Sequence, residues 1–371
     1  MTMEKSGVRE IVAKAHRHNG ELRDRRRLEA QATRRNIEQD DFTREISEKE
    51  AKTLANTCKS GKISVAEFRN LSEAISAQSG FAEHFLSQDG CLHALVGYLS
   101  GRDAAKQVLA LQCLVNLASQ GHRAEAVARA AGAYLVTLVS GTNQQLAQFA
   151  SHCLANLALA SGAAVPVLLA QEAVPTLVSL SLAPATSPDT QDAALAALYQ
   201  LTRAQSLPYD SLRSLASACL SLLSVRPPIH LLWLLYSLSA SPTLHNHFAS
   251  RAFLNQCIDI ATYEIFQKCD SRPLVKLLTP VVRILANLAA GPDSVTVCLC
   301  LVRHPDFPTI LTALLSTNYL HLCKEAIWLF ANIVNNESVT VQEEFVSLDL
   351  MDRLETHAVA AVSRLDPYAL G

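Results

Sequence analysis

Residues 154–158 read Leu-Ala-Asn-Leu-Ala, and the same five residues return at 285–289. Related words are Leu-Val-Asn-Leu-Ala at 114–118, Leu-Tyr-Gln-Leu-Thr at 198–202, Leu-Tyr-Ser-Leu-Ser at 235–239 and Phe-Ala-Asn-Ile-Val at 330–334. We call the central residue of each word its marker, and the markers fall at positions 116, 156, 200, 237, 287 and 332. Successive markers are about 40–50 residues apart, a step typical of helical repeats.

A second series keeps the same step. Leu-Val pairs stand at 95–96, 135–136 and 177–178, each just after a small or turn-forming stretch. Two series in phase indicate an armadillo or HEAT solenoid with two or three helices per repeat. We therefore predict an all-α fold, a right-handed armadillo-repeat superhelix (α-solenoid). About 6–8 repeats would occupy residues 51–360, between a charged arm at 1–50 and a tail at 361–371.

Composition agrees with this fold. Hydrophobic residues make up 49% of the chain and aromatic residues 6%, and the abundant Leu and Ala are strong helix formers. A chain of 371 residues would ordinarily suggest two or three domains, but a solenoid grows as one body because each repeat contacts only its neighbours. Prolines expected to stop helices rather than kink them are Pro184, Pro188, Pro227, Pro228, Pro292 and Pro305.

Several functional classes find no support in the sequence. A net charge of −2 gives no global attraction to nucleic acid or to an anionic membrane. Ten cysteines are scattered, and the one close pair, Cys298 and Cys300, lies among apolar residues, so we expect buried reduced thiols. The N-terminus lacks the apolar core of a secretory signal. No metal-ligand spacing, phosphate loop or nucleophile elbow is present, so we expect no cofactor and no enzymatic activity.

Charge is concentrated in residues 21–45, where seven arginines stand among acidic residues. This segment has almost nothing to bury, so it lies outside the predicted core. It is either a solvated helix or short coiled-coil arm, or a basic arm that docks on an acidic partner.

By contrast, residues 130–171 contain no Asp, Glu, Lys or Arg. A membrane-spanning helix needs about 20 predominantly apolar residues. Glycines, asparagines, glutamines and Pro166 interrupt this run at the repeat boundaries, so we expect buried solenoid helices rather than membrane insertion. Residues 213–240 raise the same question, and Arg226-Pro227-Pro228 should divide them into two helices too short to span.

Four stretches together resemble the importin-α family of armadillo adaptors, which carry basic nuclear localisation signals. Lys324–Asn336 is similar to the family's Lys-Glu-Ala-x-Trp-x-x-x-Asn-Ile helix. Asn116–Ser119 with Gly121 is similar to the family's turn after such a helix, and Ala131–Val136 to the opening of the repeat that follows. Val65–Arg69 resembles the opening of its first repeat, and Glu21–Asp41 its importin-β-binding arm. The array is shorter than the family's, and the branch named for transmembrane and coiled-coil segments is another possible relative.

The resemblance implies a nuclear import adaptor that works in the cytoplasm and the nucleus. Its partners would be basic cargo peptides and an importin-β-like receptor, with no direct contact to nucleic acid. Cargo would bind in a concave groove lined by Trp and Asn four residues apart, here Trp328, Asn332, Asn287, Trp233, Asn156 and Asn116. The receptor would bind the arm through Arg23, Arg25, Arg26, Arg27, Arg34 and Arg35.

Most markers depart from the family's pair. The positions four residues before Asn116, Asn156 and Asn287 hold Gln112, His152 and Arg283, and the weaker copies have Ala196 with Gln200 and Trp233 with Ser237. Arg283 would repel a lysine-rich ligand.

Other interpretations therefore remain open. The asparagines could tie adjacent repeats together by bonding a neighbour's backbone, and the tryptophans could be core residues. The alternative function is an armadillo scaffold for protein–protein interaction that has lost cargo recognition, possibly at a membrane.

Overall fold

The computed structural model describes residues 48–77, 79–119, 123–204, 207–267, 272–317 and 319–347. Throughout these ranges the chain forms helices and no β-strand. The chain divides between Cys91 and Leu92 into two compact units. The predicted arm and tail lie outside the described residues, so the proposed domain boundaries stay predictions.

The first unit contains α2 (Glu48–Lys59), α3 (Val65–Ala77) and α4 (Ser79–Ser87), each of which packs against the other two. A capping box starts α3, because the Ser64 amide donates to Glu67 Oε2 at 2.9 Å and the Glu67 amide donates to Ser64 Oγ at 3.2 Å. Hydrogen bonds from Ser64 lower the pKa of Glu67. The helix thus begins at Val65, where the sequence placed the opening of the first repeat.

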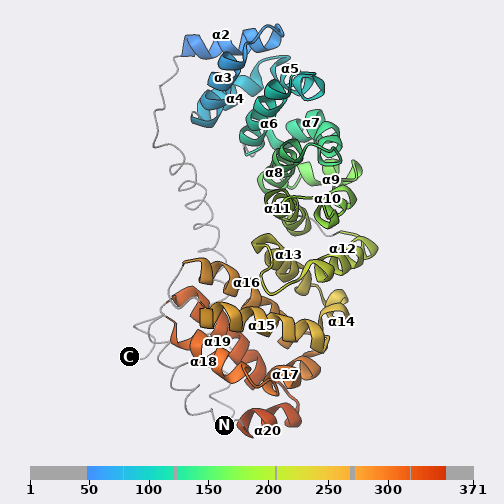
Figure 1. Ribbon diagram of the computed structural model, residues 1–371, viewed down its shortest axis with the longest axis vertical. Helices are drawn as coiled ribbons and strands as arrows, with labels where there is room; N and C mark the ends of the chain where they lie inside the picture. The colour runs from blue at the N-terminus through green and yellow to red at the C-terminus, as the bar shows by residue number, and fades with distance from the viewer. Residues whose placement is uncertain are drawn as a thin grey trace. The chain divides into compact units, whose positions relative to one another are not determined.

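Six long helices of the second unit each contain one marker, and we call them the rung helices. They are α6 (Ala104–Ala118), α8 (Gln144–Ala160), α11 (Pro188–Ala204), α13 (Ile229–Ser239), α16 (Arg272–Ala289) and α19 (Leu320–Val334). Each rung helix packs against the next one along the chain (Figure 1). This serial packing of equivalent helices is that of a solenoid, and it confirms the all-α solenoid predicted from the marker spacing.

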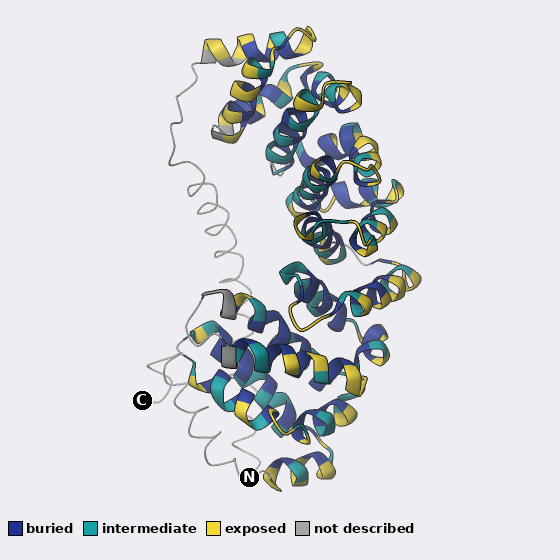
Figure 2. Cartoon of the chain, in the orientation of Figure 1, coloured by how far each residue is buried: buried dark blue, intermediate teal, exposed yellow. Residues whose placement is uncertain are grey.

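The remaining described helices mostly pack on the rung helices or on one another. They are α5 (Cys91–Gly97), η1 (Tyr98–Ser100), α7 (Ala124–Val139), α9 (Ala164–Ala170), α10 (Ala173–Leu182), α12 (Tyr209–Leu222), η3 (Pro242–Leu244), α14 (His245–Phe248), α15 (Arg251–Gln267), α17 (Ser294–Val302), α18 (Phe307–Ser316) and α20 (Val339–Ser347). Among them, α7, α10, α12, α15 and α18 each pack on a rung helix. Buried Leu and Ala residues are abundant in these helices, and Figure 2 colours the buried positions of the cartoon dark blue.

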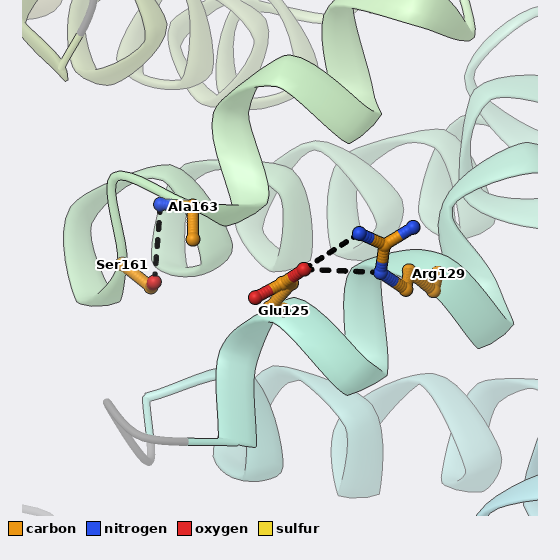
Figure 3. A network of polar contacts seen from close by, with 4 residues as sticks. All are labelled: Glu125, Arg129, Ser161 and Ala163. Carbon is orange, nitrogen blue, oxygen red and sulfur yellow. Dashed lines mark hydrogen bonds and ion pairs between the residues drawn. The ribbon is translucent and has the colours of Figure 1, made fainter.

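Local polar residues set where some of these helices start. Asn143 caps the N-terminus of α8, because its Oδ1 accepts a hydrogen bond from the Leu146 amide at 3.2 Å. Between α8 and α9, Ser161 Oγ accepts from the Ala163 amide at 3.3 Å (Figure 3). The same view shows Glu125 and Arg129 on α7, an exposed ion pair of 2.7 Å that adds little stability.

The charge-poor run at 130–171 is divided among α7, α8 and α9, and residues 213–240 between α12 and α13. Within the described residues, no single helix has both the length and the apolarity to cross a membrane. Two bent pairs, α9 with α10 at 69° and α17 with α18 at 91°, reach that length and composition together.

The prolines mostly lie where the sequence placed them. Pro188 is the first residue of α11, while Pro227, Pro228, Pro292 and Pro305 lie between helices. Pro280 is the exception that the sequence reasoning did not name, since it lies inside α16.

Of the nine cysteines in the described ranges, eight are buried and Cys300 is half-buried. Burial raises the pKa of Cys298 to about 11 and that of Cys58 to about 12, so these thiols stay protonated. The described part of the chain contains no cluster of three metal-ligating side chains.

Candidate functional site

The markers share one environment. Asn116, Asn156, Gln200, Ser237, Asn287 and Asn332 are all half-buried. The residues four positions before them, one helical turn away, are half-buried too, except Ala196, which is buried. Because neighbouring rung helices pack together, these twelve positions form a row, which we call the rung face. Trp328 and Asn332 both belong to it.

Three of the asparagines bond the rung helix that precedes their own. Asn156 Nδ2 donates to the Val115 carbonyl at 2.9 Å, across 41 residues of chain. Asn332 Nδ2 donates to the Ala286 carbonyl at 2.9 Å. Asn287 Nδ2 donates to Ser239 Oγ at 3.0 Å and to the Tyr236 carbonyl at 3.3 Å. In every case the carbonyl belongs to the residue just before the preceding marker.

The position of these carbonyls explains the bonds. The last four carbonyls of an α-helix have no backbone donor within the regular helical ladder. Val115, Tyr236 and Ala286 are each the fourth residue from the end of α6, α13 and α16. The Ala286 carbonyl also accepts from the Ala290 amide at 3.2 Å, and the Tyr236 carbonyl from Ser239 Oγ at 2.9 Å. Each asparagine therefore ties its own helix to the C-terminal turn of the preceding rung helix, beside a second donor at Tyr236 and Ala286, and the interpretation of the asparagines as ties between repeats fits this geometry.

The two markers that are not asparagine follow rung helices that extend further past their own markers. The helices α6, α13 and α16 end two residues after their markers, at 118, 239 and 289, and an asparagine comes next. The helices α8 and α11 end four residues after theirs, at 160 and 204, and are followed by Gln200 and Ser237. The carbonyls of Ala155 and Tyr199 therefore lie inside their helices, where a backbone amide of the next turn can pair with them. An asparagine marker thus follows a helix that ends two residues after its own marker, and Gln200 and Ser237 follow helices that end four residues after theirs.

The position four residues before Asn287 holds Arg283, whose side chain contacts residues of two other rung helices. Its guanidinium lies over the rings of Trp233 and Tyr236, 5.5 and 5.4 Å from their centroids. It also forms an ion pair with Glu325 of α19, and the two side chains are only 13% and 7% exposed. We call Trp233, Tyr236, Arg283 and Glu325 the Arg283 cluster.

The arginine of this cluster is held in its charged form. Burial alone would lower the pKa of Arg283, but the hydrogen bond and negative charge of Glu325 outweigh burial and raise it. The aromatic rings also contact one another, because Trp233 meets Tyr236 edge-on at 5.8 Å and Tyr199 at 6.1 Å. The cation that we expected to repel a basic ligand is therefore already paired within the chain.

A second polar cluster joins α8, α11 and α13. Asp192 Oδ2 lies 2.8 Å from His230 Nδ1, and Asp192 Oδ1 accepts from the His230 amide at 3.3 Å. Burial would raise the pKa of Asp192, but its hydrogen bonds with His230 outweigh burial and lower it. Burial, assisted by the charge of His230, lowers the pKa of His152.

Sequence reasoning missed most partners in these clusters. The signal for Tyr199 and Tyr236 was present, since each directly precedes a marker in the two weaker words. Glu325 and Asp192 lie seven and eight residues before their markers, about two helical turns away and on the same side of the helix. The six arginines proposed to bind a receptor lie outside the described residues.

No protein-family model matches this chain. The chain is similar to the crystal structure of an engineered protein at a TM-score of 0.54 and 21% identity, covering 67% of this chain and 100% of that one. A second engineered protein has a TM-score of 0.53 and 18% identity, with 85% and 89% covered. A designed armadillo repeat protein reaches only a TM-score of 0.44 at 16% identity, with 76% and 98% covered. The two similarities with a TM-score above 0.5 concern the fold alone. Together with the serial packing of the rung helices, they identify the fold of this chain as an all-α solenoid.

Proposed function

We propose that the rung face binds an extended peptide segment of a partner protein. The observation that carries this proposal is the row of half-buried polar and aromatic side chains that continues over six successive rung helices. A solenoid whose repeats present equivalent positions offers a long binding surface of this kind. The protein would act as a scaffold for protein–protein interaction rather than as an enzyme.

The hydrogen-bonding capacity of the asparagines suits such a ligand. A side-chain amide has two N–H donors and one carbonyl oxygen. The bond to the preceding rung helix uses one N–H of Asn156 and one of Asn332, which leaves an N–H and Oδ1 on each. Packed helices lie about 8–10 Å apart and an extended chain rises about 3.3 Å per residue, so two or three peptide residues would span one rung.

The charges at this face favour a ligand that is not rich in lysine or arginine. Asp192 and Glu325 are carboxylates beside the rung face; Asp192 already pairs with His230, and Glu325 pairs with Arg283 of that face. A basic peptide that competed for Glu325 would have to break the largely buried pair with Arg283, and breaking a buried pair is strongly unfavourable.

A peptide-display selection on the full chain tests the proposal. Selected peptides should lose affinity at least ten-fold for Trp328→Ala, because an aromatic anchor at an interface contributes this much. They should keep it for Arg129→Ala, whose side chain is exposed on α7. The proposal fails if no peptide is enriched, or if the selected peptides bind both variants equally.

A second candidate function rests on the arginine-rich segment at 21–45 and its resemblance to an importin-β-binding arm. On this proposal the chain is an import adaptor of the cytoplasm and nucleus, bound to an importin-β-like receptor through Arg25, Arg26 and Arg27 among others, and it carries basic cargo. The full chain should retain purified importin-β in a pull-down, and changing these three arginines to alanine should abolish retention. Absence of binding by the unaltered chain would exclude this function.

A further inference from the structure

We propose that Arg283 is an internal ligand, which fills a cation site that the rung face would otherwise present to the arginine of a peptide. This inference rests on the proposed function for its biological meaning, because the site lies on the rung face. The site itself consists of Trp233, Tyr236 and Glu325, from α13 and α19, whereas the cation comes from α16.

The contacts of Arg283 are those of a guanidinium ligand in a binding site. Two aromatic rings face its guanidinium at 5.5 and 5.4 Å, within the range of a cation–π interaction. The Glu325 carboxylate supplies the opposite charge. A ring face and a carboxylate are the two groups that recognise an arginine side chain with greatest selectivity.

Arg283 is nevertheless less completely bonded than a purely structural arginine would be. Its Nε–H is buried without a hydrogen-bond partner in the described residues, although buried donors normally find one. An external guanidinium, free of the α16 backbone, could turn to use all of its donors. The site is therefore complementary to the guanidinium group and less so to the side chain that carries it here.

Occupation by Arg283 gives this stretch of the rung face its specificity. An arriving lysine or arginine would have to displace a side chain that is 13% exposed and leave the Arg283–Glu325 pair broken. The site thus rejects basic side chains because Arg283 already occupies it. The neighbouring Trp328 and Asn332 on α19 offer an aromatic ring and a side-chain amide instead.

Removing the Arg283 side chain should uncover the site. The full chain carries two tryptophans, so a Trp328→Phe background leaves Trp233 as the only indole reporter. In this background Arg283→Ala should respond to guanidinium ion at constant ionic strength with a saturable change in Trp233 fluorescence and a rise in melting temperature. The apparent Kd should be roughly millimolar, since so small a ligand makes few contacts.

Controls separate a site from a solvent effect. Urea has the planar shape of guanidinium without its charge, and it should produce no saturable change. Arg203→Ala, which removes an exposed arginine over the Tyr199 ring, should not respond to guanidinium either. Changing Glu325 to alanine in addition should weaken guanidinium binding at least ten-fold.

Each outcome decides the proposal. A saturable response to guanidinium, absent with urea, supports it, and a folded Arg283→Ala protein without that response overturns it. If this variant does not fold in buffer, refolding from urea into millimolar guanidinium but not into sodium chloride supports the site, while refolding in neither overturns it. Because no peptide is used, failure here leaves the peptide-binding proposal standing.

Discussion

Replacing the tie asparagines one at a time tests whether they cap the preceding rung helix. Asn156→Ala removes the 2.9 Å bond to the Val115 carbonyl. Asn116→Ala is the matched control, because the Asn116 side chain makes no hydrogen bond within the described residues although it occupies the equivalent position on α6. Both substitutions replace a half-buried asparagine in the C-terminal half of a rung helix with alanine.

The expected difference follows from opposing contributions. A side-chain hydrogen bond contributes about 1 kcal/mol net, and a partly buried carbonyl left without its donor adds about 1 kcal/mol of cost. Alanine gains roughly 0.6 kcal/mol over asparagine in a helix interior. Asn156→Ala should therefore destabilise locally by about 1.4 kcal/mol, while Asn116→Ala should be neutral or stabilising by about 0.6 kcal/mol.

Hydrogen exchange measured by mass spectrometry resolves this effect along the chain. Amides at the C-terminal end of α6, on the neighbouring helix, should exchange about ten-fold faster in Asn156→Ala than in the unaltered protein, since about 1.4 kcal/mol is a factor of ten. The reasoning is refuted if only α8 itself exchanges faster, or if Asn116→Ala has the same effect on its surroundings.

Three further predictions concern the other markers and the two clusters. Gln200→Asn should leave the melting temperature within about 1 °C, because the Ala155 carbonyl lies inside α8 and needs no cap. Glu325→Gln should destabilise the fold by about 3 kcal/mol, because it leaves a largely buried guanidinium unpaired. The double variant Arg283→Met with Glu325→Leu should destabilise it less, since neither charge remains. Urea denaturation measures both free energies of unfolding. Burial lowers the pKa of His152 in the folded protein, so the unfolded chain binds the proton more readily and acid favours unfolding. The melting temperature of the unaltered protein should therefore fall between about pH 6.5 and 5, and that of His152→Gln should fall less.

The sequence was sufficient for the fold because every repeat solves the same packing problem. A helix that packs on equivalent neighbours needs equivalent residues at equivalent positions, so the six markers identified the six rung helices before their bounds were known. The division of the charge-poor run into separate helices followed from its interrupting polar residues.

The roles of the markers were harder to predict. An asparagine tie depends on whether the preceding helix ends two or four residues after its own marker, and helix ends are the least predictable feature of a sequence. The weak words at 200 and 237 therefore looked like decayed copies, although they follow α8 and α11, the two helices that end four residues after their markers. The Arg283–Glu325 pair spans 42 residues, so only the register between neighbouring repeats could have indicated it.

The most direct test of peptide binding at the rung face is a scan of backbone N-methylation along a selected peptide, with affinity for the full chain measured by fluorescence anisotropy. The Oδ1 of an asparagine can accept a hydrogen bond from the peptide backbone only where a peptide N–H is present. We predict losses of at least ten-fold at the peptide positions that face an asparagine, two or three residues apart for the neighbouring rungs α6 and α8 and again for α16 and α19, and no loss between them. Uniform affinity across the scan would contradict recognition of an extended backbone by this face.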